Sequence, residues 1–450
     1  MARGKKKETL TPEDRLQAAL VPESEQPYKV PGNWCWVSLQ TIDQYRASST
    51  DPSKYPDTLF ELYSVPSSAD NYPEIVSGCE IGSTKQSVQK GDILLCKINP
   101  RINRVWKVSQ YTGNALLASS EWIIIRNSKI VSDYLMYCFR APYFREYMLS
   151  NVSGVGGSLM RAQPKYVKTY PVPLPPLPEQ QRIVDRIESL FARLDEAKQK
   201  AQDALDSFET RKAAILHKAF TGELTAQWRK EHGVGMESWE TKKYSEICNI
   251  VRGGSPRPAG SPEFYGGNIP FMKVADITRN TGPYVNSTEY TIKEAGLKKT
   301  RMVDRNTLLL TNSGATLGVP AICTFKTTFN DGIAAFLGLN PDTLLFHYYF
   351  WTSKTAALRA INKGAAQPNL NTDIIGNVEI SLPRENEQCE IVRLLDNLLA
   401  KEQQAKESAE GVLEQIDLIK KAILARAFRG ELGTNDPAEE SAVELLKQVL

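Results

Sequence analysis

An internal repeat divides this chain into two similar halves. The segment 212–224 returns as 420–432, 208 residues later, with nine of its thirteen positions identical. The same offset carries the Glu-Gln pair at 179–180 onto the Glu-Gln pair at 387–388. A repeat fixes the architecture before any other inference, and 450 residues exceed the usual size of one hydrophobic core. We therefore expect two related units in tandem.

The middle of each half is unlike the middle of the other. Residues 92–95 and 307–310 share a hydrophobic pattern, so the two halves still correspond there. Directly afterwards, residues 97–101 read Lys-Ile-Asn-Pro-Arg, whereas residues 312–316 read Asn-Ser-Gly-Ala-Thr. The duplication thus predicts two similar frames that present different side chains.

The repeated part of each half predicts a long helix. From 179 to 220, apolar or alanine side chains recur at alternating spacings of four and three, and the second copy repeats this from 391 onward. That spacing is typical of a coiled-coil seam. Prolines precede the first helix, and Gly222 and Gly430 stand where a left-handed residue closes a helix. The apolar helix positions that we expect to pack are Ile183, Ile187, Leu190, Phe208, Ile215, Phe220, Ile391, Leu395, Leu398, Ile416, Ile423 and Phe428.

Chain direction predicts how the two helices pair. The first leads from the first globular unit to the second, and the second starts where the second unit ends, so packed seams must run antiparallel. At about 1.5 Å per residue, each would span roughly 60 Å, which gives a dumbbell of two globules on one rod. The alternative is that each helix packs on its own domain as an ordinary core element.

The remaining sequence predicts mixed α and β domains. Short β-type runs are broken by Gly, Pro and Asn and interleave with short helical stretches. We therefore expect an α+β fold with a pseudo-two-fold internal repeat: two mixed α/β domains, joined and separated by two long antiparallel coiled-coil helices. The predicted segments are an N-terminal arm 1–27, a first domain 28–178, a first spacer helix 179–224, a linker 225–236, a second domain 237–383, a second spacer helix 384–432 and a C-terminal tail 433–450.

Charge placement suggests where these domains could bind nucleic acid. A formal net charge of +3 does not by itself indicate such a partner, but the stretch 93–120 holds no acid and four basic residues lie within it close together. Arginine and lysine accept phosphates, and asparagine can read base edges. The alternative for each patch is a solvated surface. The predicted DNA contacts are Lys97, Asn99, Arg101, Arg104, Arg161 and Lys165 in the first domain, and Arg252, Arg257, Asn312 and Asn369 in the second.

No catalytic or metal-binding motif stands out. The three histidines are scattered, the seven cysteines include no C-x-x-C pair, and no Walker loop, G-x-S-x-G or H-E-x-x-H motif occurs. No run of about 18 apolar residues predicts a membrane span, and no signal peptide opens the chain. We expect a cytoplasmic protein without a catalytic residue, metal or cofactor of its own.

Two variable domains, each closed by a proline-rich segment, a Glu-Gln pair, a heptad helix and an A-F-x-G-E-L ending, resemble the specificity subunit of type I restriction–modification systems. Residues 175–184 and 219–224 carry the likeness in the first half, and residues 387–392 and 427–432 in the second. The second copy departs from the family at 384–386, where another proline-leucine pair is usual.

The resemblance implies a non-catalytic subunit of an adenine-specific DNA methyltransferase and restriction endonuclease. Each domain would read one half of a bipartite target in double-stranded DNA, and the helices would fix the gap and dock two modification subunits. Those subunits would bind S-adenosylmethionine, while restriction subunits would use ATP and Mg²⁺ to translocate and cut DNA.

Two other classes of protein stay open. The alternative function is a non-catalytic duplicated scaffold without DNA recognition, and salt-sensitive DNA binding by the assembled complex discriminates the two. An independent enzyme would show methyl transfer by the isolated chain.

Overall fold

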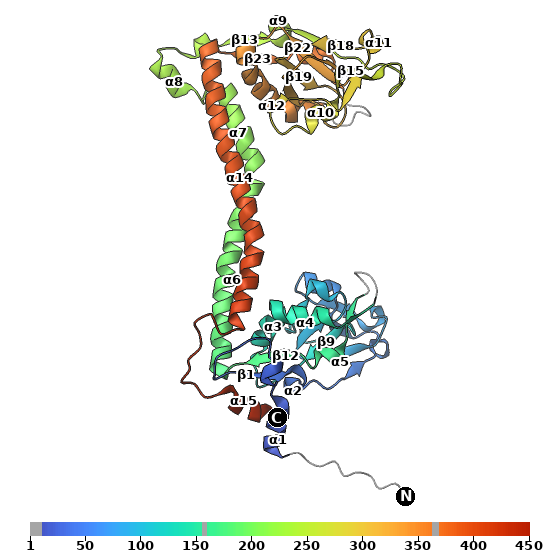
Figure 1. The fold of residues 1–450 in the computed structure, drawn as a ribbon, viewed down its shortest axis with the longest axis vertical. Coiled ribbons are helices and arrows are strands. Elements are labelled where there is room, and N and C mark those ends of the chain that lie inside the picture. Colours follow the sequence, from blue (N-terminus) through green and yellow to red (C-terminus); the bar gives the residue numbers. More distant parts are fainter. Residues whose placement is uncertain (1–10, 155–159, 362–368) are drawn as a thin grey trace. The chain divides into compact units, whose positions relative to one another are not determined.

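The computed structural model describes residues 11–154, 160–361 and 369–450. They form two compact units: the first combines the chain up to Ala201 with Gly411–Leu450, and the second is Gln202–Glu410. Each unit holds a mixed α/β domain together with parts of the long helices (Figure 1). The α+β architecture with two related domains is therefore as the sequence predicts. Among the described residues, no helix is long and apolar enough to cross a membrane.

The first domain begins and ends on one antiparallel strand pair, β1 (Cys35–Ser38) with β12 (Pro171–Leu174). Its larger sheet has the strand order β2 (Ser49–Thr50), β5 (Lys85–Ser87), β8 (Ala115–Ala118), β3 (Leu59–Tyr63) and β4 (Glu74–Ser77). The smaller sheet has the order β7 (Val105–Lys107), β6 (Ile93–Cys96) and β9 (Trp122–Ile125), and β10 (Val152–Ser153) pairs with β11 (Arg161–Ala162). Its helices are α2 (Leu39–Ile42), α3 (Ser132–Arg140), α4 (Pro142–Ser150) and α5 (Pro164–Val167).

The second domain is closed in the same way, by β13 (Glu240–Lys243) with β23 (Glu379–Leu382). One sheet has the order β14 (Asn249–Arg252), β22 (Ile333–Leu337), β19 (Thr307–Thr311), β20 (Pro320–Cys323) and β16 (Tyr284–Val285). The other has the order β17 (Tyr290–Ile292), β15 (Tyr265–Met272), β21 (Thr327–Phe329) and β18 (Arg301–Val303). Its helices are α9 (Tyr244–Ile247), α10 (Val274–Thr278), α11 (Glu294–Leu297), α12 (Leu344–Ile361) and α13 (Thr372–Gly376).

The long helices pack together in opposite directions. The first copy forms α6 (Leu177–Asp206) and α7 (Phe208–Phe220), and the second forms the continuous helix α14 (Glu385–Ala427), which runs beside them in Figure 1. In the first unit Lys420 on α14 pairs with Asp195 at 2.5 Å, and in the second Glu402 pairs with Arg211 at 2.8 Å. Within the second unit, Arg229 further along the chain pairs with Glu387, so residue numbers rise on the first copy's side as they fall along α14, which confirms the antiparallel prediction.

The twelve helix positions named in the sequence analysis are all buried or half-buried, whereas Val412 and Ile419, which also fit the apolar spacing, are exposed. Ile183, Ile187, Ile391, Leu395 and Phe428 are fully covered by the cores of their units. Their apolar character is therefore explained by packing within the chain. Whether any of the predicted helix positions also contacts a partner stays a prediction.

The long helices of the two halves start and end at equivalent positions, but the first is interrupted once. Gly222 and Gly430 have φ of 81° and 75°, so both are the left-handed closing residues that the sequence predicts. α14 begins at the position equivalent to the start of α6, so the sequence departure at 384–386 leaves the helix start unchanged. The exception is Ser207, where the expected single first helix is broken: its hydroxyl donates to the carbonyl of Asp203 at 2.7 Å, a side-chain bond that bends helices.

The Glu-Gln pair of each half lies buried at a helix start. In the second unit, Glu387 accepts hydrogen bonds from Thr225 at 2.7 Å, Arg229 at 2.7 Å and the Trp239 indole at 3.1 Å. In the first unit, Glu179 accepts from Thr434 at 2.6 Å and pairs with Arg182 at 2.9 Å. Each carboxylate therefore joins the start of one long helix to the segment that follows the end of the other.

The core of the first unit includes residues near the two ends of the described chain, namely Ala19, Ala442, Leu445 and Leu446. The predicted arm includes α1 (Pro12–Ala19), with the η1 turn Glu23–Glu25 after it, while its residues 1–10 lie outside the described part. The predicted tail includes α15 (Ala442–Val449), whose Leu446 is fully buried in a cluster that also holds Ala19. The predicted linker 225–236 contains the short helix α8 (Ala226–Glu231), followed by the η6 turn Met236–Ser238.

Leu446→Ala is expected to destabilise the first unit by about 2–5 kcal/mol, the usual cost of truncating a buried leucine. Thermal unfolding of the full chain measures this as a lower midpoint for the transition of that unit. Lys447→Ala is the matched control, because Lys447 is exposed and makes only a surface pair with Glu444. Equal midpoints for the two variants would show that α15 does not stabilise the unit.

Candidate nucleic-acid interface

The candidate reading loop of the first unit, residues 97–104, joins two buried strands. The backbone N–H of Cys96 donates to the carbonyl of Arg104 at 3.0 Å, which closes the loop at its base. Asn99 and Asn103 have left-handed backbones with φ of 48° and 52°, a conformation that asparagine tolerates better than most residues. The loop therefore has a defined backbone shape that its side chains decorate.

Four predicted DNA contacts lie together on this loop. Arg101 is exposed, whereas Lys97, Asn99 and Arg104 are half-buried. The Arg101 guanidinium approaches the sulfur of Met160 at 3.3 Å. None of the three cations forms an ion pair with any residue that the structure describes. Their charges are therefore available to an anionic ligand.

A segment some 60 residues further along the chain pairs with the loop. The N–H of Ala162 donates to the carbonyl of Lys97 at 2.8 Å, and the N–H of Asn99 donates to the carbonyl of Met160 at 2.8 Å. These bonds place Arg161 directly beside the loop. The structure thus unites five of the six contacts that were predicted in the first domain.

The two other predicted cations of this domain, Arg161 and Lys165, have different neighbours. Arg161 lies 3.4 Å from the carboxylate of Glu121, so part of its charge is neutralised within the domain. Lys165 is exposed on α5 with its Nζ 4.6 Å from the centre of the Tyr166 ring. A DNA contact by either residue stays a prediction.

The second unit builds the same loop from different residues. The equivalent loop is residues 312–319. The N–H of Thr311, directly before it, donates to the carbonyl of Val319 at 3.0 Å and closes the loop at its base, as in the first unit. The left-handed positions are Gly314 and Gly318, with φ of 80° and 81°, and they correspond to the two left-handed asparagines of the first loop. The frame is therefore duplicated even where the sequence repeat is no longer recognisable.

The partner segment of the second loop is equivalent too. The N–H of Leu370 donates to the carbonyl of Asn312 at 2.7 Å, and Asn369 forms a β-bridge with Ser313. Asn369 is exposed beside this loop, as Arg161 is beside the first. The two halves thus present an arginine and an asparagine from equivalent places.

The other contacts predicted in the second domain gather around the turn at Asp331 and Gly332. Arg252 donates from Nε to the carbonyl of Asp331 at 2.6 Å, Arg257 lies 3.7 Å from its carboxylate, and Gly332 accepts from the N–H of Asn312 at 2.9 Å. The side chain of Asn312 departs from the expectation of a surface contact, because it is fully buried and both its polar atoms lack a partner. The Asn312 side chain could contact a base only if the residues that bury it moved.

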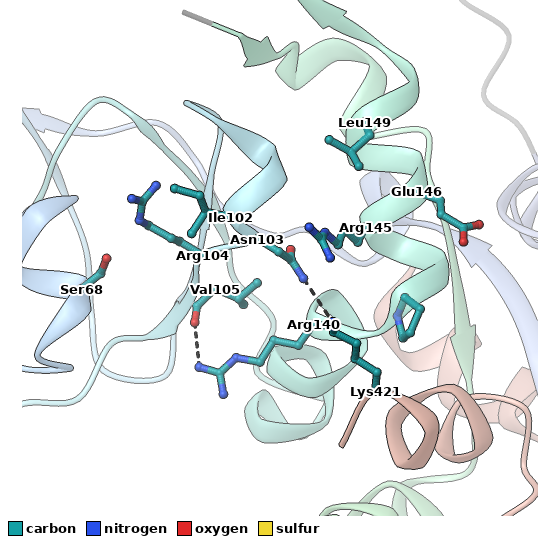
Figure 2. Close-up of a pocket in the computed structure, with 11 residues that line it drawn as sticks. Ser68, Ile102, Asn103, Arg104, Val105, Arg140, Arg145, Glu146, Leu149 and Lys421 are labelled. Atoms are coloured by element: carbon teal, nitrogen blue, oxygen red, sulfur yellow. Dashed lines mark hydrogen bonds between the residues drawn. The ribbon is translucent and has the colours of Figure 1, made fainter. Parts of the chain in front are cut away.

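Sequence reasoning missed a basic pocket beside the loop 97–104. The pocket has a volume of about 580 Å³, and four cations from four elements line it: Arg104, Arg140 of α3, Arg145 of α4 and Lys421 of α14 (Figure 2). Three of these lie on helices far from the loop in sequence. The sequence shows that these three residues are positively charged, but it does not show that the fold brings them together.

The described residues outside this region show no metal site, and the buried His347 has a packing role. Among the described residues, no three His, Cys, Asp or Glu side chains gather as metal ligands. His347 is buried with its Nδ1 3.0 Å from the hydroxyl of Tyr244, and burial lowers its pKa to about 4. It is therefore neutral near pH 7 and makes a buried hydrogen bond with Tyr244, a residue of the second unit's core.

The comparisons with known proteins agree on one family. A family model, the type I restriction modification DNA specificity domain, matches the chain twice, over residues 49–205 and 236–411. The specificity subunit of the type I restriction enzyme EcoDI from Escherichia coli is 31% identical over 209 residues, 45% of each chain, so this chain aligns with just under half of that relative. The EcoKI specificity subunit from Escherichia coli strain K12 is 22% identical over 353 residues, 72% of this chain and 73% of that one.

A solved structure has the same fold. The HsdS subunit from Thermoanaerobacter tengcongensis superposes with a TM-score of 0.66 at 23% sequence identity, covering 91% of this chain and 100% of that one. Two family matches within the chain, one in each half, parallel the two loops built on one frame. The chain belongs to the type I restriction–modification DNA specificity family and is a DNA specificity subunit of such a system.

Proposed function

We propose that each of the two domains reads one half of a bipartite sequence in double-stranded DNA. The first domain, 28–178, reads one half-site and the second, 237–383, reads the other, while the helices 179–224 and 384–432 set the unread gap. The arm 1–27, the linker 225–236 and the tail 433–450 connect and complete these parts. The observation that carries the proposal is the loop frame that is built twice with different side chains.

The chemistry of the two loops supports two different readouts. The first loop offers Lys97, Asn99 and Arg101, side chains that pair with guanine, adenine and phosphate oxygens. The second loop carries no charge and is flanked by Arg252 and Asn369. A shared backbone with exchanged side chains would let one architecture address unrelated half-sites.

The chemical steps belong to partner subunits in this proposal, since the specificity subunit is a non-catalytic component. Two modification subunits dock on the helices, bind S-adenosylmethionine and methylate adenine after flipping it out of the duplex. Restriction subunits use ATP and Mg²⁺ to translocate and cleave the DNA. The complex acts on DNA in the cytoplasm.

The proposal is tested by selecting bound sequences from a pool of random duplexes with the assembled complex of this chain and its modification subunits. The expected result is a split motif with a fixed gap and an affinity that falls steeply with salt. Binding without a motif, or no salt-sensitive binding, would leave a duplicated scaffold. Methyl transfer by the isolated chain would instead indicate an enzyme.

Replacing Arg101 and Arg104 together with alanine is expected to weaken binding to the selected duplex by about tenfold or more, because hydrogen bonds from charged groups contribute about 1.5–3 kcal/mol each. The affinity of the complex for the duplex, and the motif selected from the random pool, are both measured. Lys129→Ala is the control, since Lys129 is exposed and lies outside the loop. Unchanged affinity and an unchanged motif would remove this loop from the interface.

A further inference from the structure

The pocket beside the first reading loop holds more positive charge than the protein compensates. Arg104, Arg140, Arg145 and Lys421 line it, and none of them forms an ion pair among the described residues. Three other cations of the same unit are paired: Lys107 with Asp133, Arg126 with Asp92, and Lys420 with Asp195. The single acid in the lining is Glu146, which is exposed and points away from the arginines in Figure 2.

The two helical arginines are held in place by neutral acceptors. Arg140 donates from Nη2 to the carbonyl of Val105 at 2.8 Å, and Arg145 donates from Nη2 to the carbonyl of Arg101 at 2.5 Å. The first bond holds a guanidinium at the start of β7, directly after the reading loop, and the second holds one against the loop itself, and neither bond neutralises the charge. The Nε of Arg145 is buried and has no partner, and burial lowers the pKa of Arg140. Half-buried charges of this kind are stabilised by an anion that accepts several hydrogen bonds.

We infer that this pocket binds a backbone phosphate of the DNA whose bases the first domain reads. The inference rests on the proposed function and adds to it: helix α14 contributes a DNA contact through Lys421, besides its packing role. The pocket shares a wall with the loop that carries Asn99 and Arg101, so a duplex held by that loop brings its sugar–phosphate chain to the pocket. Arginine forks suit phosphate oxygens bidentately, and such contacts position a duplex without reading its sequence.

The repeat indicates that this contact is made on one side only. Lys421 corresponds to Ala213 in the first copy of the repeat, and Arg104 corresponds to Val319 in the second loop. Two of the four cations therefore have uncharged counterparts. The first half-site is thus anchored by a phosphate clamp that the equivalent residues of the other half do not reproduce.

The test uses the assembled complex of the full chain with its modification subunits. Arg145→Gln and Lys421→Gln each remove one charge and are expected to lower the affinity for the motif duplex and for an unrelated duplex by the same factor, about three- to tenfold. Each should also reduce the slope of log affinity against log salt by about one. Lys420→Gln is the matched control, because the neighbouring Lys420 pairs with Asp195 and lies outside the pocket lining.

A second measurement locates the phosphate. Single phosphates of the motif duplex are replaced by neutral methylphosphonates, and at one position the loss of affinity should be large for the original complex and clearly smaller for the Arg145→Gln complex, which keeps three of the four cations. Unchanged affinity and salt slope in both variants, with the original complex still selecting its motif, would overturn the phosphate clamp alone. A changed motif in either variant would overturn it as well, since the pocket would then read bases. Failure of the original complex to select any motif would overturn the proposed function and the clamp with it.

Discussion

Exchanging residues 244–378 for the corresponding segment of another specificity subunit is expected to change one half of the recognised sequence and leave the other half and the gap unchanged. The structure supplies the reason, because β13 and β23 form an antiparallel pair in which Lys243 lies opposite Glu379. The exchanged segment thus begins and ends at neighbouring backbone positions, about 5 Å apart in such a pair. The long helices and the first domain keep their own sequence. Methylation mapping of cells with each version of the gene reads both half-sites.

The exchange needs a donor that preserves the packing on α7. Phe220 contacts Phe346 and Phe350 with ring centres 5.4 Å apart in each case, so the donor should carry aromatic residues at those two positions. The reciprocal exchange of 39–170, bounded by β1 and β12, is the matched control and should alter only the other half-site. A change in both half-sites from a single exchange would contradict independent reading by the two domains.

Arg229→Ala is expected to destabilise the second unit by about 3–5 kcal/mol, because it leaves a buried carboxylate without its cation. The side chains of Arg229 and Glu387 are 8% and 2% exposed and lie 2.7 Å apart. Arg229 also donates to the carbonyl of Gly222 at 2.5 Å, so the same change releases the closing turn of α7. Thermal unfolding of the full chain should show a lower midpoint for this unit.

Two further variants separate charge from packing. Arg211→Ala removes an ion pair with Glu402 whose side chains are 36% and 22% exposed, and it should cost about 1 kcal/mol or less. Combining Arg229→Met with Glu387→Gln removes both buried charges and should restore part of the loss, since a neutral pair leaves no uncompensated charge. If Arg229→Ala cost no more than Arg211→Ala, the buried pair would not be what joins the helix ends.

Most of the fold was predictable because its signals are local and occur twice. Heptad spacing predicted the long helices, and the glycines at 222 and 430 predicted where they end. The break at Ser207 was not predictable from apolar spacing, because it depends on a hydroxyl that bonds back to the helix. The position of α15 in the core of the first unit was also beyond reach, since it depends on contacts between residues more than 400 positions apart.

The candidate interface was predictable only where its residues are close in sequence. The loop 97–104 was found because its cations lie within a few residues of each other and no acid interrupts them. Arg145 and Lys421 were missed because only tertiary packing brings them to that loop. Asn312 was predicted as a DNA contact, but its side chain is fully buried, because burial continues one residue beyond the end of the buried strand β19.

The decisive measurement is a map of methylated adenines in cells that carry the modification subunits, with and without the gene for this chain. Long-read sequencing should reveal a split motif with a fixed gap that appears only when the gene is present. Such a map would give both half-sites at once and assign the choice of sequence to this chain. Methylation at the same sites without the gene, or a complex that assembles with the chain and methylates no defined motif, would contradict that role.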